Sequence, residues 1–268
     1  MTRVPAVADR FYPGDPEQLR SALAMFVPEV AEEDKQPALA VVLPHAGYVY
    51  SGATAGATIS RVKVPETVVI LGPNHHGRGA PLALGTEDWR MPLGTVVIDR
   101  QLAASILDQS GNIVEDSQAH LLEHSLEVQV PFFQQVQPRL RIVPLVVAHL
   151  SYQQCQAVAR ELAAALSAYQ HPALLAASTD MSHYESRQQA SRKDQLAIER
   201  VLALDPEGLY RTVIGQDISM CGVIPTTITL LTALELGATK AELVRYTDSG
   251  EATGDTAQVV GYAGLIIS

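Results

Sequence analysis

Three apolar runs in this chain each end at a polar loop that contains histidine. LAVVL leads to His45, VVIL leads to His75 and His76, and LLAAS leads to Asp180 and His183. Ligands of open α/β sheets gather where strands end at their carboxyl edge, because loops there aim side chains at one point. A single histidine at a strand end is usually structural, but its repetition in three distant segments favours a shared site that binds metal or moves protons.

The side chains that could bind a metal come from several parts of the chain. They are His45, His75, His76, His124, Asp180, His183 and Cys221. A metal needs deprotonated nitrogen, oxygen or sulfur donors at about 2.0 to 2.3 Å, and catalytic sites rarely draw them from one short segment. The sequence contains no HExxH motif and no paired CxxC motif. Spacing alone therefore does not select the ligands.

Cys221 lies in SMCGVIPTT, directly before a glycine and a helix that we expect to start at Pro225. Peptide N–H groups at a helix start stabilise a thiolate, so this thiol is a candidate metal ligand or nucleophile. The alternative is a buried, small apolar residue. Cys155 follows a helix cap at Ser151 and fits the apolar face of an amphipathic helix, which predicts an inert core thiol.

Asp180 and His183 are spaced so that the carboxylate could orient the imidazole and raise its basicity, which suits general acid and base catalysis. The alternative is that Asp180 or Ser182 caps a helix. His124 lies in EDSQAHLLEHSLEVQVPFFQQV, whose spacing predicts a helix that Pro131 kinks or divides. His124 either is a surface helix residue paired with Glu127 or Glu123, or takes part in a site on the buried face that Leu121, Leu122 and Leu126 indicate.

The chain alternates strand-like and helix-like segments from end to end. Asp15 and Pro16 open a helix, and a strand with a buried character closes the chain at 259–267. The strand at 139–147 contains Pro144, which predicts an edge or bulged strand. This rhythm predicts a three-layer α/β/α sandwich with a mainly parallel or mixed sheet. Because no linker or repeat divides residues 1–268, we expect a single domain.

Composition excludes several classes of protein. The chain has 268 residues, of which 47% are hydrophobic and 18% are charged, a composition typical of a folded globular protein. Its 19 basic and 29 acidic residues give a net charge of −10, which disfavours nucleic-acid binding. No apolar run approaches the roughly 20 residues of a membrane span, and the start lacks a signal core. With only two cysteines, we expect a cytoplasmic protein.

Several unusual blocks, in this order, make the chain resemble the Memo-like family. The blocks are PHAGYVYSG, LGPNHHG, EHSLEVQVPF, STDMSHY, MCGVIP and YTDSGEATGD. The resemblance covers nearly the whole chain and implies the fold of class III extradiol dioxygenases, non-haem iron enzymes that open catechol rings with O₂. It also implies His45, His75 and Cys221 as metal ligands, with Asp180 and His183 completing the pocket. His76 and His124 match motif positions without a defined role.

The resemblance leaves three functions open. The first is an oxidoreductase in which His45, His75 and Cys221 hold iron or copper while Asp180, His183 and His124 act in catalysis; the thiolate in place of a carboxylate favours copper(I) or zinc and alters the redox behaviour of iron. The second is a non-catalytic module for a peptide, such as a phosphotyrosine peptide, or for the AMMECR-type and radical-SAM proteins that accompany family members. The third is hydrolysis by zinc-activated water.

Overall fold

The computed structural model describes residues 2–268, which build one mixed sheet of 12 strands. Its centre is a parallel core in the spatial order β6, β8, β3, β9 and β2. These strands are β6 (Gly94–Ile98), β8 (Arg141–Val147), β3 (Thr67–Pro73), β9 (Ala173–Ser178) and β2 (Ala40–Leu43). All residues of β2 and β3 are buried. Such continuous apolar strands are typical of a parallel sheet covered on both faces.

The other strands extend this core at its two sides. Beyond β2 lies β12 (Val259–Ile267), antiparallel to β2 and flanked by β11 (Ala241–Asp248) and β10 (His183–Glu185). Beyond β6 lie β5 (Asp88–Met91) and β1 (Thr2–Arg3), and β8 also pairs with β4 (Leu82–Leu84), next to β7 (Val114–Glu115). The sheet is therefore mixed around a parallel centre.

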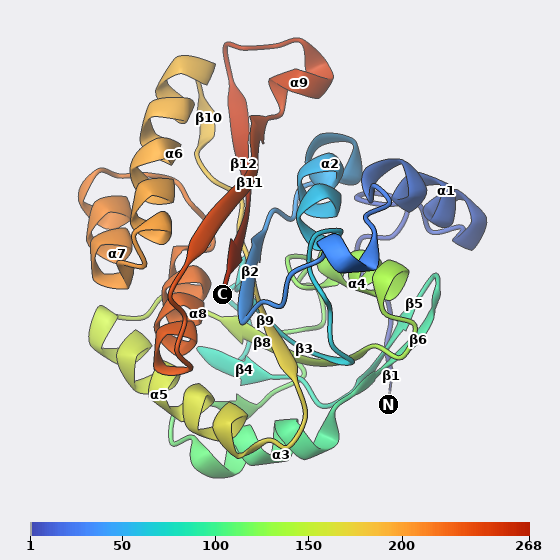
Figure 1. Ribbon diagram of the computed structural model, residues 1–268, viewed down its shortest axis with the longest axis vertical. Helices are drawn as coiled ribbons and strands as arrows, with labels where there is room; N and C mark the ends of the chain where they lie inside the picture. The colour runs from blue at the N-terminus through green and yellow to red at the C-terminus, as the bar shows by residue number, and fades with distance from the viewer. Residues whose placement is uncertain (1) are drawn as a thin grey trace.

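Helices cover both faces of the sheet (Figure 1). One layer contains α1 (Pro16–Phe26), α2 (Tyr48–Ile59) and α4 (Val130–Val136). The other contains α3 (Arg100–Gln109), α5 (Tyr152–Ala168), α6 (Arg187–Leu202), α7 (Pro206–Gly215) and α8 (Val223–Glu235). Short helical segments occur at η1 (Glu32–Asp34), η2 (Glu127–Gln129) and α9 (Gly250–Thr253). The predicted three-layer α/β/α sandwich is confirmed. No helix within residues 2–268 combines the length and apolar character needed to cross a membrane.

Several helix ends form where the sequence predicts them. The carboxylate of Asp15 accepts the N–H groups of Glu17 and Gln18, and Pro16 occupies the first turn of α1. Ser151 caps α5 in a reciprocal capping box with Gln154. Each signal depends only on neighbouring residues, so it survives in the folded chain.

The helix predicted from the spacing around His120 and His124 is wrong for residues 117–126. That segment consists of turns, bends and irregular loop, and regular helix begins only with η2 and α4, where Pro131 lies in the first turn. The guanidinium of Arg3 donates to the carbonyl oxygens of His120 and Glu123, both at 2.7 Å. In a helix those carbonyls would accept N–H groups four residues ahead. Contacts with the N-terminal arm, which is residues 2–15, thus replace the helical hydrogen bonds.

The prediction for Pro144 also needs correction. Strand β8 lies inside the sheet, and its register with β3 is unbroken from Arg141 to Val147. On its other side, β6 pairs with Arg141 and Ile142 and β4 pairs with residues 145–147. Pro144 therefore lies at the junction between two partner strands, and its carbonyl accepts the N–H of Gly85 at 3.0 Å. Proline has no N–H to donate to a neighbouring strand. At Pro144 the sheet tolerates this loss, because the strand beside β8 changes there from β6 to β4.

Candidate metal centre

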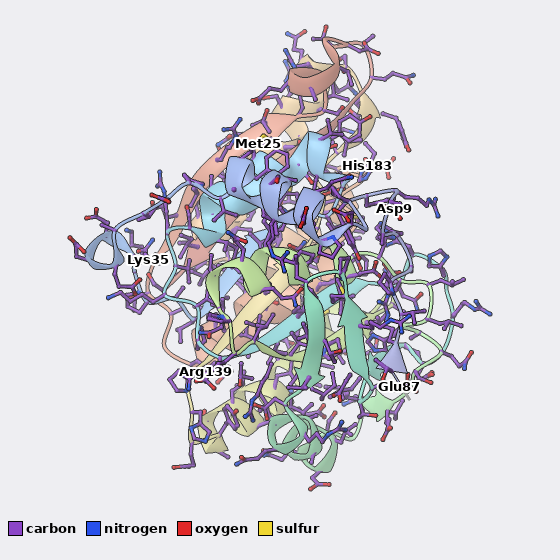
Figure 2. The ribbon with its side chains drawn as sticks, turned by 90° about the vertical axis from the view of Figure 1, so that its right-hand side faces the viewer. Asp9, Met25, Lys35, Glu87, Arg139 and His183 are labelled. Atoms are coloured by element: carbon purple, nitrogen blue, oxygen red, sulfur yellow. The ribbon has the colours of Figure 1, made fainter. Side chains whose placement is uncertain are left out.

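Three neighbouring parallel strands bring the histidine loops to one edge of the sheet. Strand β9 lies between β2 and β3, with Leu43 opposite Ser178 and Leu71 opposite Ala177. The loops after β2, β3 and β9 therefore begin side by side at the carboxyl edge. Figure 2 shows His183 on the upper side of the molecule and Arg139, which precedes β8, on the lower side. The adjacency of these strands comes from the sheet order, which local sequence patterns do not reveal.

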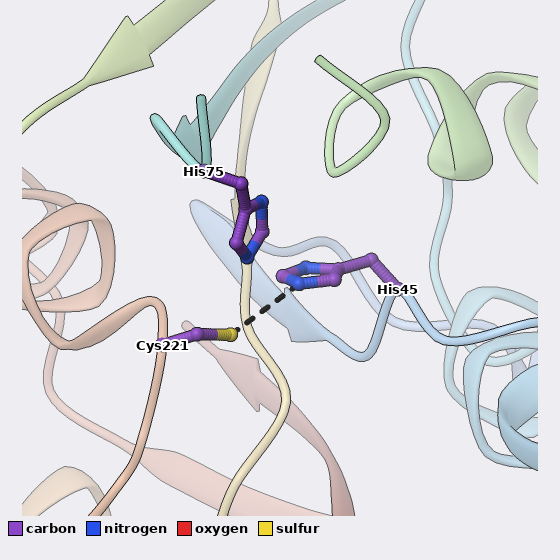
Figure 3. Close-up of side chains that lie close together, drawn as sticks. All are labelled: His45, His75 and Cys221. Atoms are coloured by element: carbon purple, nitrogen blue, oxygen red, sulfur yellow. Dashed lines mark hydrogen bonds between the residues drawn. The ribbon is translucent and has the colours of Figure 1, made fainter. Parts of the chain in front are cut away.

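His45, His75 and Cys221 converge at this edge. One ligand atom from each side chain lies within 4.8 Å of the others, and Cys221 Sγ is 3.3 Å from His45 Nε2. Figure 3 shows the two imidazole rings and the thiol pointing toward one another. His45 is buried, Cys221 is partly buried and His75 is exposed. The cluster is thus embedded on the His45 side and open to solvent on the His75 side.

His45 is fixed by hydrogen bonds to its ring and its backbone. Its Nδ1 lies 2.9 Å from Ser178 Oγ, and its N–H donates to Asp180 Oδ1 at 2.7 Å. Burial, and then the neighbouring His124 and His75, hold the pKa of His45 well below its usual value. The ring is therefore neutral at physiological pH, the form in which imidazole binds a metal.

His75 is held by Glu123, a carboxylate that sequence reasoning treated only as an ion-pair partner of His124. Glu123 Oε1 lies 2.9 Å from His75 Nδ1, and Oε2 accepts the His75 N–H at 2.7 Å. Burial raises the pKa of Glu123, but its hydrogen bonds to His75 and Ser125 outweigh that effect and bring it to about 2. Local spacing could not predict this contact, because 48 residues separate the partners. Its sequence signal is the block EHSLE, which begins at Glu123.

His124 completes a group of three imidazoles. Its ring stacks on His75 with centroids 4.6 Å apart and meets His45 edge to face at 5.5 Å. Phe11 packs on it from the N-terminal arm at 4.8 Å. Burial lowers the pKa of His124 to about 4, with Glu123 opposing the shift. His75, Glu123 and His124 also form a second group with donor atoms within 4.8 Å.

Cys221 lies just before α8, whose N-cap is Gly222. Its Sγ accepts the N–H of Asp180 at 3.2 Å. Burial, and then the charge of Asp180, raise the pKa of the Cys221 thiol well above its usual value. A cation between the thiol and the two imidazoles would reverse this effect, because a coordinated thiol loses its proton.

Asp180 and His183 lie near the cluster but have different partners from those expected. Asp180 accepts the His45 N–H, whereas His183 Nδ1 lies 2.9 Å from the carbonyl oxygen of Ser219. Within residues 2–268 the two side chains form no hydrogen bond with each other. Burial raises the pKa of Asp180 to about 6. Neither Asp180 nor Ser182 caps a helix, because strand β10 follows and Ser186 caps α6.

The remaining histidines lie outside the cluster. His76 is exposed beside His75, and His149 and His171 are also exposed. His120 is buried, and its Nε2 lies 2.9 Å from the carbonyl oxygen of Ala83. His120 is thus a buried structural residue, and His149 and His171 are surface residues.

A pocket of about 470 Å³ lies beside the cluster, between the N-terminal arm, α1 and the start of α2. Its walls include Phe11, Gly47 and Tyr50. Phe11 also packs on His124, so the pocket adjoins the imidazoles. A second cavity of about 520 Å³ opens at the opposite edge, beside Thr67 and Asp99. The first of these contacts the cluster through Phe11, and the second lies at the far edge of the sheet.

The donor set suits a transition metal. Metal–nitrogen and metal–sulfur bonds of about 2.0 to 2.3 Å place neighbouring donors about 3 to 4 Å apart, close to the spacing found here. Both imidazoles have Nδ1 occupied by a protein oxygen, which leaves their other nitrogens to face the thiol. Two imidazoles and a thiolate match copper, zinc or iron better than magnesium or calcium. The residues present therefore fit such an ion.

Comparison with known proteins finds relatives of one family. The family profile described as Memo-like protein matches residues 3–266. A MEMO1 family protein of Methanopyrus kandleri is 40% identical, with 99% of each chain covered. A MEMO1 family protein of Aquifex aeolicus is 42% identical over 98% of each chain, and one of Methanothermobacter thermautotrophicus is 38% identical over 99% of this chain. The similarity extends over the whole length of these relatives.

Proposed function

We propose that this chain, which belongs to the Memo-like family, is a metal-dependent oxidoreductase whose single ion is held by His45, His75 and Cys221. The observation that carries the proposal is the convergence of these three donors at one edge of the sheet. Iron or copper bound there would supply redox chemistry with O₂, which side chains alone do not provide. The soft thiolate favours copper, with zinc as a third candidate.

The chain's own residues would prepare the site. Asp180 holds the His45 backbone and donates its own N–H to Cys221, so it fixes two of the donors relative to each other. His124 and His183 are the imidazoles available to take or give a proton near a bound substrate. His124 is neutral at physiological pH, because burial keeps its pKa at about 4. It would therefore act first as a hydrogen-bond partner or proton acceptor.

The pocket beside Phe11 and Tyr50 would hold the organic substrate. Its aromatic walls favour a small aromatic or apolar molecule, since aromatic rings pack on one another at their faces and edges. Because Phe11 lines this pocket and packs on His124, we propose that a molecule bound there lies next to the cluster. This arrangement supports catechol-like substrates as the first to test.

Metal analysis of protein purified without oxygen tests the ligand assignment. The informative variant combines His45→Ala, His75→Ala and Cys221→Ala, and the matched control combines His149→Ala, His171→Ala and Cys155→Ala. We expect wild type and control to retain one equivalent of iron, copper or zinc and the first variant to retain none. Equal metal content in all three would refute the assignment. Oxygen uptake with catechols tests the redox chemistry separately.

The same pocket motivates a second candidate function, the binding of a peptide or a partner protein without catalysis. Exposed apolar side chains surround it, with Met25 77% and Val49 67% exposed. The net charge of −10 acts against a phosphopeptide, although Arg10 lines the pocket. Calorimetric titration with phosphotyrosine peptides and with AMMECR-type and radical-SAM proteins tests this function. Heat of binding that disappears in Phe11→Ala and persists in the triple alanine variant of the metal ligands would favour it over catalysis.

A further inference from the structure

A short segment, Glu123 to Ser125, is connected to both imidazoles of the candidate metal centre: it hydrogen-bonds His75 directly and reaches His45 through Ser178. Glu123 is 1% exposed, and its carboxylate accepts the backbone N–H groups of His75 at 2.7 Å and Ser125 at 2.9 Å. These contacts fix the orientation of the carboxylate. Its Oε1, which also accepts the Ser125 N–H, then lies 2.9 Å from His75 Nδ1.

This arrangement determines which nitrogen of His75 carries the proton. An ionised carboxylate only accepts hydrogen bonds, so the ring nitrogen that contacts it must donate. His75 Nδ1 therefore carries hydrogen, and Nε2 keeps a free lone pair. Figure 3 shows the far side of this ring directed toward His45 and Cys221. Glu123 thus presents the metal-binding nitrogen of His75 to the other donors.

The same reasoning applies to His45 through Ser178. The hydroxyl of Ser178 donates its one hydrogen to the carbonyl oxygen of Ser125 at 2.7 Å. It accepts the side-chain amide of Gln129 at 2.8 Å and lies 2.9 Å from His45 Nδ1. Because its only hydrogen is already used, the hydroxyl oxygen must accept from His45. The Nε2 of His45, 3.3 Å from Cys221 Sγ, is then the free nitrogen.

We propose that Glu123 and Ser178 are positioning residues that fix both histidines as Nδ1–H tautomers, with the Glu123–Ser125 segment as their common support. This inference deepens the proposed function and rests on it, because the two free Nε2 atoms matter most if a metal binds between them and Cys221. Partners that orient metal-binding imidazoles raise metal affinity about 10- to 100-fold. Ser125 joins the two contacts, since its N–H binds Glu123 and its C=O binds Ser178.

Nitrogen-15 NMR of the histidine rings in the metal-free protein tests the tautomers directly. In wild type we expect His45 and His75 each to show a protonated Nδ1 and a bare Nε2. Glu123→Gln should convert His75 to a mixture of tautomers and leave His45 unchanged, and Ser178→Ala should do the reverse. The matched control is Asp99→Asn, a buried carboxylate that binds Thr67, Tyr169 and Leu102 at the other edge of the sheet. The control should change neither ring.

Zinc affinity, measured by competition with a chromophoric chelator, gives a second readout. We expect Glu123→Gln and Ser178→Ala to bind zinc about 10- to 100-fold more weakly and Asp99→Asn to bind it as wild type does. Unchanged tautomers and unchanged affinity in the folded variants would overturn the proposal. So would a second zinc equivalent that disappears in Glu123→Gln, because Glu123 would then be a ligand itself, together with His75 and His124.

The two readouts separate this inference from the proposed function. If wild type binds no metal but the tautomers respond as described, the metal assignment fails and the positioning roles remain. If metal binds and the tautomers do not respond, the positioning roles fail alone. Should Glu123→Gln not fold, Ser178→Ala carries the same test at His45, because it removes only one hydroxyl.

Discussion

The Sγ atom of Cys221 lies 3.3 Å from Nε2 of His45, although 176 residues separate them in the chain. The two approach because His45 follows β2, while Cys221 precedes α8, which packs across β2, β3 and β9. The sheet order therefore sets the distance between the thiol and the imidazole.

Cys221→Ser should weaken copper(I) binding by more than about 100-fold, because a hydroxyl is a much harder donor than a thiolate. This loss exceeds the one expected when a residue that only orients a ligand is replaced. Competition with a copper(I) chelator under anaerobic conditions measures the effect. Cys155→Ser is the matched control, since Cys155 is fully buried in α5 and burial raises its pKa to about 12. Equal copper(I) affinity in both variants would remove Cys221 from the site.

Arg3→Ala should destabilise the protein by about 3 to 5 kcal/mol, because it leaves Glu127 buried without its cation. The Arg3 guanidinium pairs with Glu127 at 2.7 Å, lies 4.2 Å from the ring centre of Trp89 and donates to the segment before His124. Urea unfolding measures the change. Arg139→Ala, which breaks an exposed ion pair with Glu66, should cost about 1 kcal/mol or less. Similar losses in the two variants would contradict this account of the N-terminal arm.

Gly56→Ala should destabilise the packing of α2 on the end of α1. A methyl group at Gly56 would lie 2.0 Å from the carbonyl oxygen of Phe26, so one helix must move, at a cost of about 1 to 3 kcal/mol or more. Gly215→Ala, at the end of α7, meets open space and should be neutral or stabilising by up to about 1 kcal/mol. Thermal unfolding of both variants measures these changes in stability. A Gly56→Ala protein as stable as wild type would contradict the prediction, because it would show that the two helices move apart here at little cost.

Buried His120 should make the fold less stable in mild acid. Burial lowers its pKa to about 4 from the ordinary 6.5, so between these values the unfolded chain binds a proton that the folded chain excludes. Stability then falls as pH drops from 6.5 toward 4, and the loss from His120 is about 2 kcal/mol at pH 5.

His120→Gln, which keeps a donor for the Ala83 carbonyl, is the variant that tests this prediction. Urea unfolding at pH 7 and pH 5 should show a smaller acid loss in the variant than in wild type. His45 and His124, whose pKa values burial also lowers, contribute equally to both proteins and cancel in the comparison. An identical acid loss in the two proteins would mean that His120 does not carry this effect.

Local sequence patterns predicted the features that depend on neighbouring residues. The caps at Asp15 and Ser151, the buried strands and the delivery of His45, His75 and Asp180 at strand ends all follow from local patterns. The alternation of strands and helices along the chain was enough to predict the layered fold. These features needed no knowledge of which strands are neighbours.

Which side chains meet depends on how distant segments pack in the folded chain. Local spacing predicted a helix around His124, but Arg3 occupies the carbonyls that the helix would need, and this contact spans 117 to 120 residues. The role of Glu123 was hidden for the same reason, since its contact with His75 depends on the path of a loop after β3. Hydrogen bonds between distant segments form only once the sheet has set their distance, so no local pattern encodes them.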